Sequence, residues 1–220
     1  MNRKWVFFQA LLVTIAVFVV GFYVGVSIES GRTTEVNNYF TQSEVSLVDI
    51  LALNNLVGSD KVSCENLVLS NKDLLDRVYG EATSLSQYEE AGKLTEGLKT
   101  LHTKYDVLRT YLWINSINIK KECPKENFST IVYLYNHDEE DLTKKAEQAV
   151  WSRLLFEVKS ENENALLIPI AHDSNLISLD YLIAPYNITD YPVVIINEKK
   201  VFYNIPQKEE VISWINNSSI

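Results

Sequence analysis

STIVYLY, residues 129–135, is the first of three short apolar runs in the C-terminal part of the chain. The other two are ALLIPI (165–170) and PVVIIN (192–197). Runs of this length that are rich in β-branched residues are typical of buried strands. Stretches with helical spacing separate them, and a short fourth run (201–203) and an amphipathic segment (207–216) follow. The order β-α-β-α-β-β-α predicts an α/β domain.

We place this domain at residues 125–220. Its first helix is expected to begin at Glu139 and to end near Lys159, with Asp138 as the N-cap. A second helix is expected near residues 176–186. Pro169 indicates that the second strand lies at an edge of the sheet or ends there, because proline cannot donate a ladder hydrogen bond.

This order resembles the thioredoxin superfamily over residues 129–216, most strongly at YPVVII (191–196). The resemblance implies a cis Tyr191–Pro192 bond, although an ordinary trans proline also opens strands. It also places the family's redox Cys-x-x-Cys at residues 136–141, where this chain reads NHDEED and has no sulfur. Thiol-disulfide exchange at that position is therefore not expected. The resemblance still implies a peptide-binding groove, whose candidate residues are Tyr191, Pro192, His137 and Asp138.

A separate apolar segment lies near the N-terminus. Residues 5–28 contain no charge, and as a helix they extend about 36 Å, which is enough to cross a bilayer. A cleaved signal peptide is the alternative, but its apolar region is shorter, roughly 7 to 15 residues. Arg3 and Lys4 predict a cytoplasmic N-terminus and an extracytoplasmic C-terminal domain. We expect an anchor at 1–28, contacting the lipid bilayer through residues 5–28, and a polar linker at 29–44.

Between the anchor and the α/β domain, residues 45–124 predict a helical hairpin preceded by a short helix at 45–56. Apolar residues recur three or four positions apart in two segments, which is the spacing of two helices packed side by side. The same spacing is compatible with a coiled coil between chains. The residues at this spacing are Leu67, Asn71, Leu74, Val78, Ala82 and Leu85 in one segment, of which Asn71 alone is polar, and Leu98, Leu101, Tyr105, Leu108 and Leu112 in the other.

Cys64 and Cys123 are the two cysteines, and they flank this hairpin. Helices folded back on each other bring the start of the first beside the end of the second, so we expect a structural disulfide. The alternatives are a redox-cycling pair and free thiols. With the anchor, the hairpin and the α/β domain, the whole layout resembles small single-pass membrane proteins of archaea.

Similar His-Asp pairs follow the first two predicted strands, at His137-Asp138 and at His172-Asp173. Parallel strands end at the same sheet edge, where ligands bind in open α/β sheets, so the two pairs are expected to face one another. His137, His172 and Asp173 are therefore weak candidates for metal ligands. The simpler reading makes Asp138 and Asp173 helix N-caps and leaves the histidines in loops, and we predict no metal and no cofactor.

Charge and composition exclude other classes of function. Without Arg3 and Lys4 the chain has 18 basic and 29 acidic residues, so nucleic acid is not an expected partner. It has no Gly-rich phosphate loop, nucleophile elbow or His-Glu-x-x-His motif. We therefore predict a membrane-tethered, extracytoplasmic module that binds a protein or peptide partner and is not an enzyme. The alternative is a thiol-disulfide oxidoreductase or disulfide-handling protein that uses Cys64 and Cys123.

Overall fold

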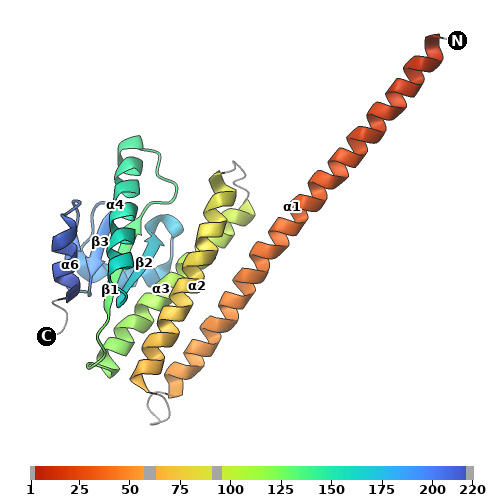
Figure 1. Cartoon of the computed structure of the whole chain (residues 1–220). Coiled ribbons are helices and arrows are strands. Elements are labelled where there is room, and N and C mark those ends of the chain that lie inside the picture. The colour runs from red at the N-terminus through yellow and green to blue at the C-terminus, as the bar shows by residue number, and fades with distance from the viewer. Residues whose placement is uncertain (1–2, 57–62, 91–95, 217–220) are drawn as a thin grey trace. The chain divides into compact units, whose positions relative to one another are not determined.

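The computed structural model describes residues 3–56, 63–90 and 96–216 (Figure 1). The chain divides into two compact units, Met1–Glu44 and Val45–Ile220. A single helix, α1 (Arg3–Leu56), begins in the first unit and ends in the second.

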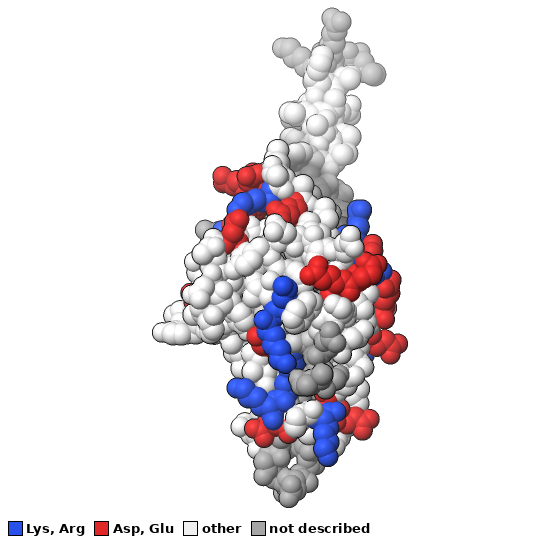
Figure 2. All heavy atoms as spheres, turned by 90° about the vertical axis from the view of Figure 1, so that its left-hand side faces the viewer, with Lys and Arg blue, Asp and Glu red and all other residues white. Residues whose placement is uncertain are grey.

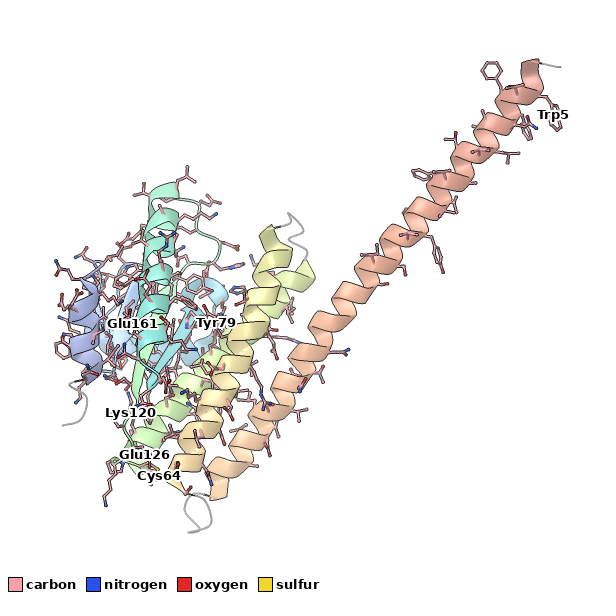
Figure 3. All side chains as sticks on the ribbon, viewed as in Figure 1. Trp5, Cys64, Tyr79, Lys120, Glu126 and Glu161 are labelled. Atoms are coloured by element: carbon pink, nitrogen blue, oxygen red, sulfur yellow. A yellow bond between two sulfur atoms is a disulfide. The ribbon has the colours of Figure 1, made fainter. Side chains whose placement is uncertain are left out.

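The first unit contains the apolar segment. Residues Trp5–Ile28 have a mean hydropathy of 2.5, and none of this segment is buried within the protein. By length and composition it is suited to crossing a membrane. Figure 3 shows its side chains projecting on all sides of the helix, with Trp5 near the N-terminal end. A helix that is apolar all round is suited to an apolar surrounding rather than to water.

The polar stretch after this segment is helical. We expected residues 29–44 to be a linker and residues 45–56 to be a separate helix, but both belong to α1. The stretch contains no proline, so each backbone N–H can continue the helical hydrogen-bond ladder. In the second unit, the last part of α1 contacts the next helix through Ser46, whose hydroxyl accepts from Arg77 Nη1 at 3.0 Å.

The predicted hairpin consists of α2 (Cys64–Glu90) and α3 (Glu96–Glu122). Most of the expected apolar positions that the structure describes are buried: Leu67, Leu74, Val78, Tyr105, Leu108 and Leu112. Asn71 lies among them and is also buried, because it bonds Ser116 Oγ and Asn115 Nδ2, each at 2.9 Å. Gly92 and Gly97 indicate a turn between the two helices in the sequence; Gly92 lies outside the described residues, whereas Gly97 lies in the first turn of α3 and not in the connection.

The sheet has four strands in the order β2-β1-β3-β4. Their bounds are β1 (Ser129–Tyr135), β2 (Ala165–Ala171), β3 (Val193–Ile196) and β4 (Lys200–Phe202). β1 and β2 are parallel, and β3 is antiparallel to both β1 and β4. Pro169 therefore lies on an edge strand, as predicted. The carboxyl ends of β1 and β2 and the start of β3 share one end of the sheet. We call this end the carboxyl edge and define it as residues 136–141, 171–174 and 190–192.

Helices cover both faces of the sheet. Trp151, Leu155 and Val158 of α4 (Leu142–Glu161) and Val211 and Ile215 of α6 (Lys208–Asn216) form one core with alternate strand residues. The strand residues of opposite parity, such as Val132 and Ile168, are also fully buried, and α3 contacts β1 and β2. The remaining elements are the short helix α5 (Ile177–Ile183) and the 3-10 turns η2 (His172–Ser174) and η3 (Ala184–Tyr186).

The first helix of the α/β part begins later than expected. α4 starts at Leu142 with Asp141, not Asp138, as its N-cap, and the Asp141 carboxylate accepts from Thr143 N at 2.7 Å. Residues 136–141, which precede α4, form a turn that Glu139 holds. Its carboxylate accepts from Asp141 N at 3.0 Å and from Asn136 Nδ2 at 3.1 Å. Side-chain bonds of this kind compete with a helical backbone and delay the start of the helix.

A polar network attaches α3 to the end of the sheet opposite the carboxyl edge. Glu198, in the turn between β3 and β4, accepts from Trp113 Nε1 at 3.0 Å, Thr130 Oγ1 at 2.6 Å and Lys120 Nζ at 2.9 Å. Burial lowers the pKa of Lys120, although the Glu198 carboxylate opposes that shift. The hairpin and the sheet therefore share a polar contact whose donors and acceptors are paired (Lys120 is labelled in Figure 3).

Candidate functional site

The two His-Asp segments meet at the carboxyl edge. The Asp173 carboxylate accepts from His137 N at 2.9 Å and from Asp138 N at 2.8 Å. The sequence predicted that these segments face one another, but it assigned Asp173 to the N-cap of a helix. The structure shows instead that Asp173 joins the segment after β2 to the segment after β1.

His172 joins the same segment to the start of β3. Its ring stacks on Tyr191 with centroids 4.0 Å apart. The Tyr191–Pro192 peptide bond is cis, as expected, and Pro192 is buried. Burial raises the pKa of the Tyr191 hydroxyl to about 12, and the negative charge of Asp180 adds to that shift. The neutral phenol therefore keeps its O–H as a hydrogen-bond donor throughout the physiological pH range.

Helix α3 supplies a third group to this edge, Asp106. This fully buried side chain accepts from Ala171 N at 3.1 Å and from the Ser174 hydroxyl. Its other neighbours are His102 Nδ1 at 3.2 Å and Arg109 Nη1 at 3.4 Å. Burial opposes ionisation of Asp106, but the hydrogen bond from His102 and the charge of Arg109 together hold its pKa below the usual range.

Two further contacts join α3 to the segment after β1. The rings of His102 and His137 lie in contact, tilted by 33° with their centroids 3.7 Å apart. Lys99 Nζ lies 2.7 Å from Asp138 Oδ2, and this contact raises the pKa of Lys99 and lowers that of Asp138. Asp138 is therefore an ion-pair partner of the hairpin and not the helix cap that the sequence suggested.

Sequence reasoning missed His102 and Asp106. The two residues are four positions apart on a helix, which is the spacing of side chains that contact each other. That pattern was visible in the sequence. The contact of Asp106 with Ala171 was not visible, because it joins residues that are 65 positions apart.

The candidate metal ligands do not come together as a set. Within residues 3–56, 63–90 and 96–216, no group of three His, Cys, Asp or Glu side chains is placed to hold a metal ion. The Asp173 carboxylate bonds backbone amides, and His172 stacks on Tyr191. The groups at this edge are thus arranged to join three segments to one another.

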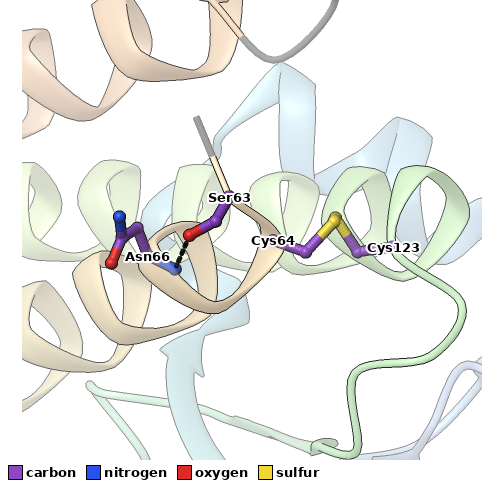
Figure 4. The surroundings of a disulfide bond; sticks show 4 residues. All are labelled: Ser63, Cys64, Asn66 and Cys123. Carbon is purple, nitrogen blue, oxygen red and sulfur yellow. Dashed lines mark hydrogen bonds between the residues drawn. A yellow bond between two sulfur atoms is a disulfide. The ribbon is translucent and has the colours of Figure 1, made fainter. Parts of the chain in front are cut away.

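The cysteine pair lies away from the carboxyl edge. Cys64, at the start of α2, and Cys123, just after α3, form a disulfide with their Cα atoms 5.7 Å apart (Figure 4). Cys123 is only 2% exposed. Beside the bridge, the Ser63 hydroxyl accepts from Asn66 N at 3.3 Å and caps the first turn of α2. The expected hairpin staple is present in the structure.

The exposed residues of the carboxyl edge are acidic, and exposed apolar side chains lie beside them. Leu142 and Ile177, at the starts of the two helices that leave this edge, are 81% and 74% exposed. Glu140 and Asp190 are exposed as well. Residues 136–141, 171–174 and 190–192 contain no cysteine or methionine. Comparisons with models of protein families, with curated proteins and with solved structures find no match to this chain.

Proposed function

We propose that this chain is a membrane-anchored, extracytoplasmic protein with a thioredoxin-like α/β domain that binds an extended peptide at its carboxyl edge. The strand order β2-β1-β3-β4 supports this proposal. So does the placement of the helices, because α4 and α6 share one core on one face of the sheet and α3 contacts its strands. The layout also supports the likeness to small single-pass membrane proteins of archaea.

The observation that carries the proposal is the joining of three segments at an edge without sulfur. Asp173 and His172 connect residues 136–141, 171–174 and 190–192, and exposed apolar side chains lie beside them. Joined segments reduce the conformational entropy that a site loses on binding. Such an edge is suited to an extended chain with apolar side chains.

Charge argues against nucleic acid as the partner. Figure 2 shows acidic and basic side chains interspersed over one face of the protein, with uncharged surface between them. A nucleic-acid interface gathers its basic residues into one patch or stripe. Together with the net charge of −9, this distribution favours a protein or peptide partner.

The alternative function, thiol-disulfide exchange by Cys64 and Cys123, has weaker support. Exchange requires an accessible sulfur with a stabilised thiolate. Cys123 is buried, and the pair lies at the end of the hairpin instead of at the carboxyl edge. Burial favours a structural role for this disulfide.

Peptide binding by the full-length protein in detergent micelles tests the proposal. Peptides selected from a displayed random library are titrated against the wild type, Tyr191→Ala and Tyr79→Ala. Tyr79 is the matched control, since it is also half-buried and stacked, on Phe156 at 6.3 Å, but lies on α2 away from the edge (Figure 3).

We expect Tyr191→Ala to weaken peptide binding by about tenfold or more, since an aromatic anchor contributes at least about 1.4 kcal/mol. Tyr79→Ala should leave the affinity nearly unchanged. Selection of no binding peptide, or equal losses in the two variants, would contradict the proposal.

A further inference from the structure

We infer that Asp106, a residue of the helical hairpin, is the positioning residue of the carboxyl edge. On this inference the hairpin is part of the binding site and does more than hold the α/β domain away from the membrane. The inference rests on the proposed function only for what the edge binds.

Asp106 fixes both ends of a four-residue turn. One carboxylate oxygen accepts from Ala171 N at 3.1 Å, and the other accepts from the Ser174 hydroxyl. These two donors flank His172 and Asp173. Asp106 belongs to α3 and its side chain is fully buried, so the packing of the hairpin fixes the position of the carboxylate.

The two residues between the fixed ends hold the rest of the edge. The Asp173 carboxylate accepts the amides of His137 and Asp138, and the His172 ring stacks on Tyr191. A shift of the turn would therefore move its contacts with both neighbouring segments. A single carboxylate of the hairpin thus acts on all three segments of the edge.

The surroundings of Asp106 favour its ionised form. His102 and Arg109 lie beside the carboxylate, and an ionised acceptor makes stronger hydrogen bonds than a neutral one. The same helix also contacts the segment after β1 directly, through the ring contact of His102 with His137. The hairpin therefore holds the edge from two sides.

Amide hydrogen exchange of the full-length protein in detergent micelles tests the inference through the variant Asp106→Asn. Asparagine has nearly the same shape but lacks the negative charge. We expect the amides of residues 137, 138 and 171–174 to exchange at least about tenfold faster, since local opening is sensed amide by amide. The amides of Ile131 and Ile195, in the sheet core, should exchange at the wild-type rate.

Asp76→Asn is the matched control, because Asp76 is an exposed carboxylate that pairs with Lys159 at 2.8 Å away from the edge. It should leave the edge amides unchanged. Equal acceleration at the edge and in the core of Asp106→Asn would show a purely structural role, and no acceleration at the edge would show no role. Either result would overturn the inference.

Ser174→Ala provides a second variant in case Asp106→Asn does not fold. It removes one of the two donors and leaves the carboxylate in place. We expect amide exchange to speed up less than in Asp106→Asn and only at residues 172–174. Unchanged exchange at these residues would overturn the inference. Because exchange needs no peptide, absence of peptide binding by the wild type would refute the proposed function and leave the exchange result to decide the role of Asp106.

Discussion

Individual carboxylate side chains hold the segments that connect the strands at each end of the sheet. Asp106 and Asp173 organise the carboxyl edge, and Glu198 organises the opposite end. Each accepts hydrogen bonds from more than one donor. Buried or partly buried acceptors of this kind are costly to remove, because the donors that remain keep the cost of desolvation.

Glu198→Ala provides the first prediction at the residue scale. The variant leaves Trp113 Nε1, Thr130 Oγ1 and Lys120 Nζ without their shared acceptor. We expect the free energy of unfolding to fall by about 2–4 kcal/mol, measured by urea titration in micelles. Glu163→Ala, at an exposed glutamate, is the control and should change stability little. A loss no larger than the control's would contradict this role for Glu198.

The pH dependence of stability provides a second prediction, from Asp106. Burial raises its pKa, but His102 and Arg109 lower it further, so the pKa in the folded protein is below the usual value. The unfolded chain then takes up this proton at higher pH than the folded protein does. The contribution of Asp106 to stability is therefore complete above about pH 4 and is lost as the pH falls through the lower pKa.

Asp106→Asn lacks this titration. As the pH falls below about 4 we expect the wild type to lose more stability than the variant, so that their stability curves converge. Thermal unfolding across this range measures both curves. Parallel curves would show that the ionisation of Asp106 does not contribute to stability.

At the scale of elements, the start of α4 is set by its cap. Asp141 accepts from Thr143 N, and the acidic turn before it is held by Glu139. Asp141→Ala should lower stability by about 1 kcal/mol and speed amide exchange in the first turn of α4. Glu140→Ala, at the neighbouring exposed residue, is the control and should leave that exchange unchanged. If both variants behave alike, Asp141 is not the effective cap.

The strands and the hairpin could be predicted from the sequence because their signals are local. STIVYLY (129–135) became β1 with the predicted bounds, and the apolar spacing of residues 64–122 became α2 and α3. Residues 29–44 were assigned to a linker from their polar composition, but composition alone does not interrupt a helical ladder. Asp138 was expected to be a helix cap because of its residue type and its place before a predicted helix. Its partner is instead Lys99 of α3, a contact that local sequence does not indicate.

The candidate site could be predicted only in part. Parallel strands end at one edge, and this rule located His137 and His172 near each other. The roles of Asp106 and Asp173 depend on contacts between residues far apart in the sequence, which periodicity cannot reveal. Spacing along α3 identified its buried face but not what that face contacts.

At the scale of the whole molecule, the account predicts a membrane orientation. Arg3 and Lys4 precede the apolar segment, and Lys and Arg are retained on the cytoplasmic side. Protease added outside intact cells should therefore remove an epitope placed after Ile220, and an epitope before Met1 should be protected. The opposite pattern would reverse the orientation, and a mature N-terminus after residue 28 would indicate a cleaved signal peptide.

The reduction potential of the Cys64–Cys123 disulfide tests the central claim, that this protein binds a partner and does not exchange thiols. It is measured on the full-length protein in micelles by titration against a dithiol redox buffer, with mass-spectrometric trapping of free thiols. Cys123 is buried and the cysteines are 59 positions apart, so we predict a potential below about −300 mV, as for a structural disulfide. A potential near about −200 mV, with mixed disulfides trapped on other proteins, would contradict the account and indicate an oxidoreductase.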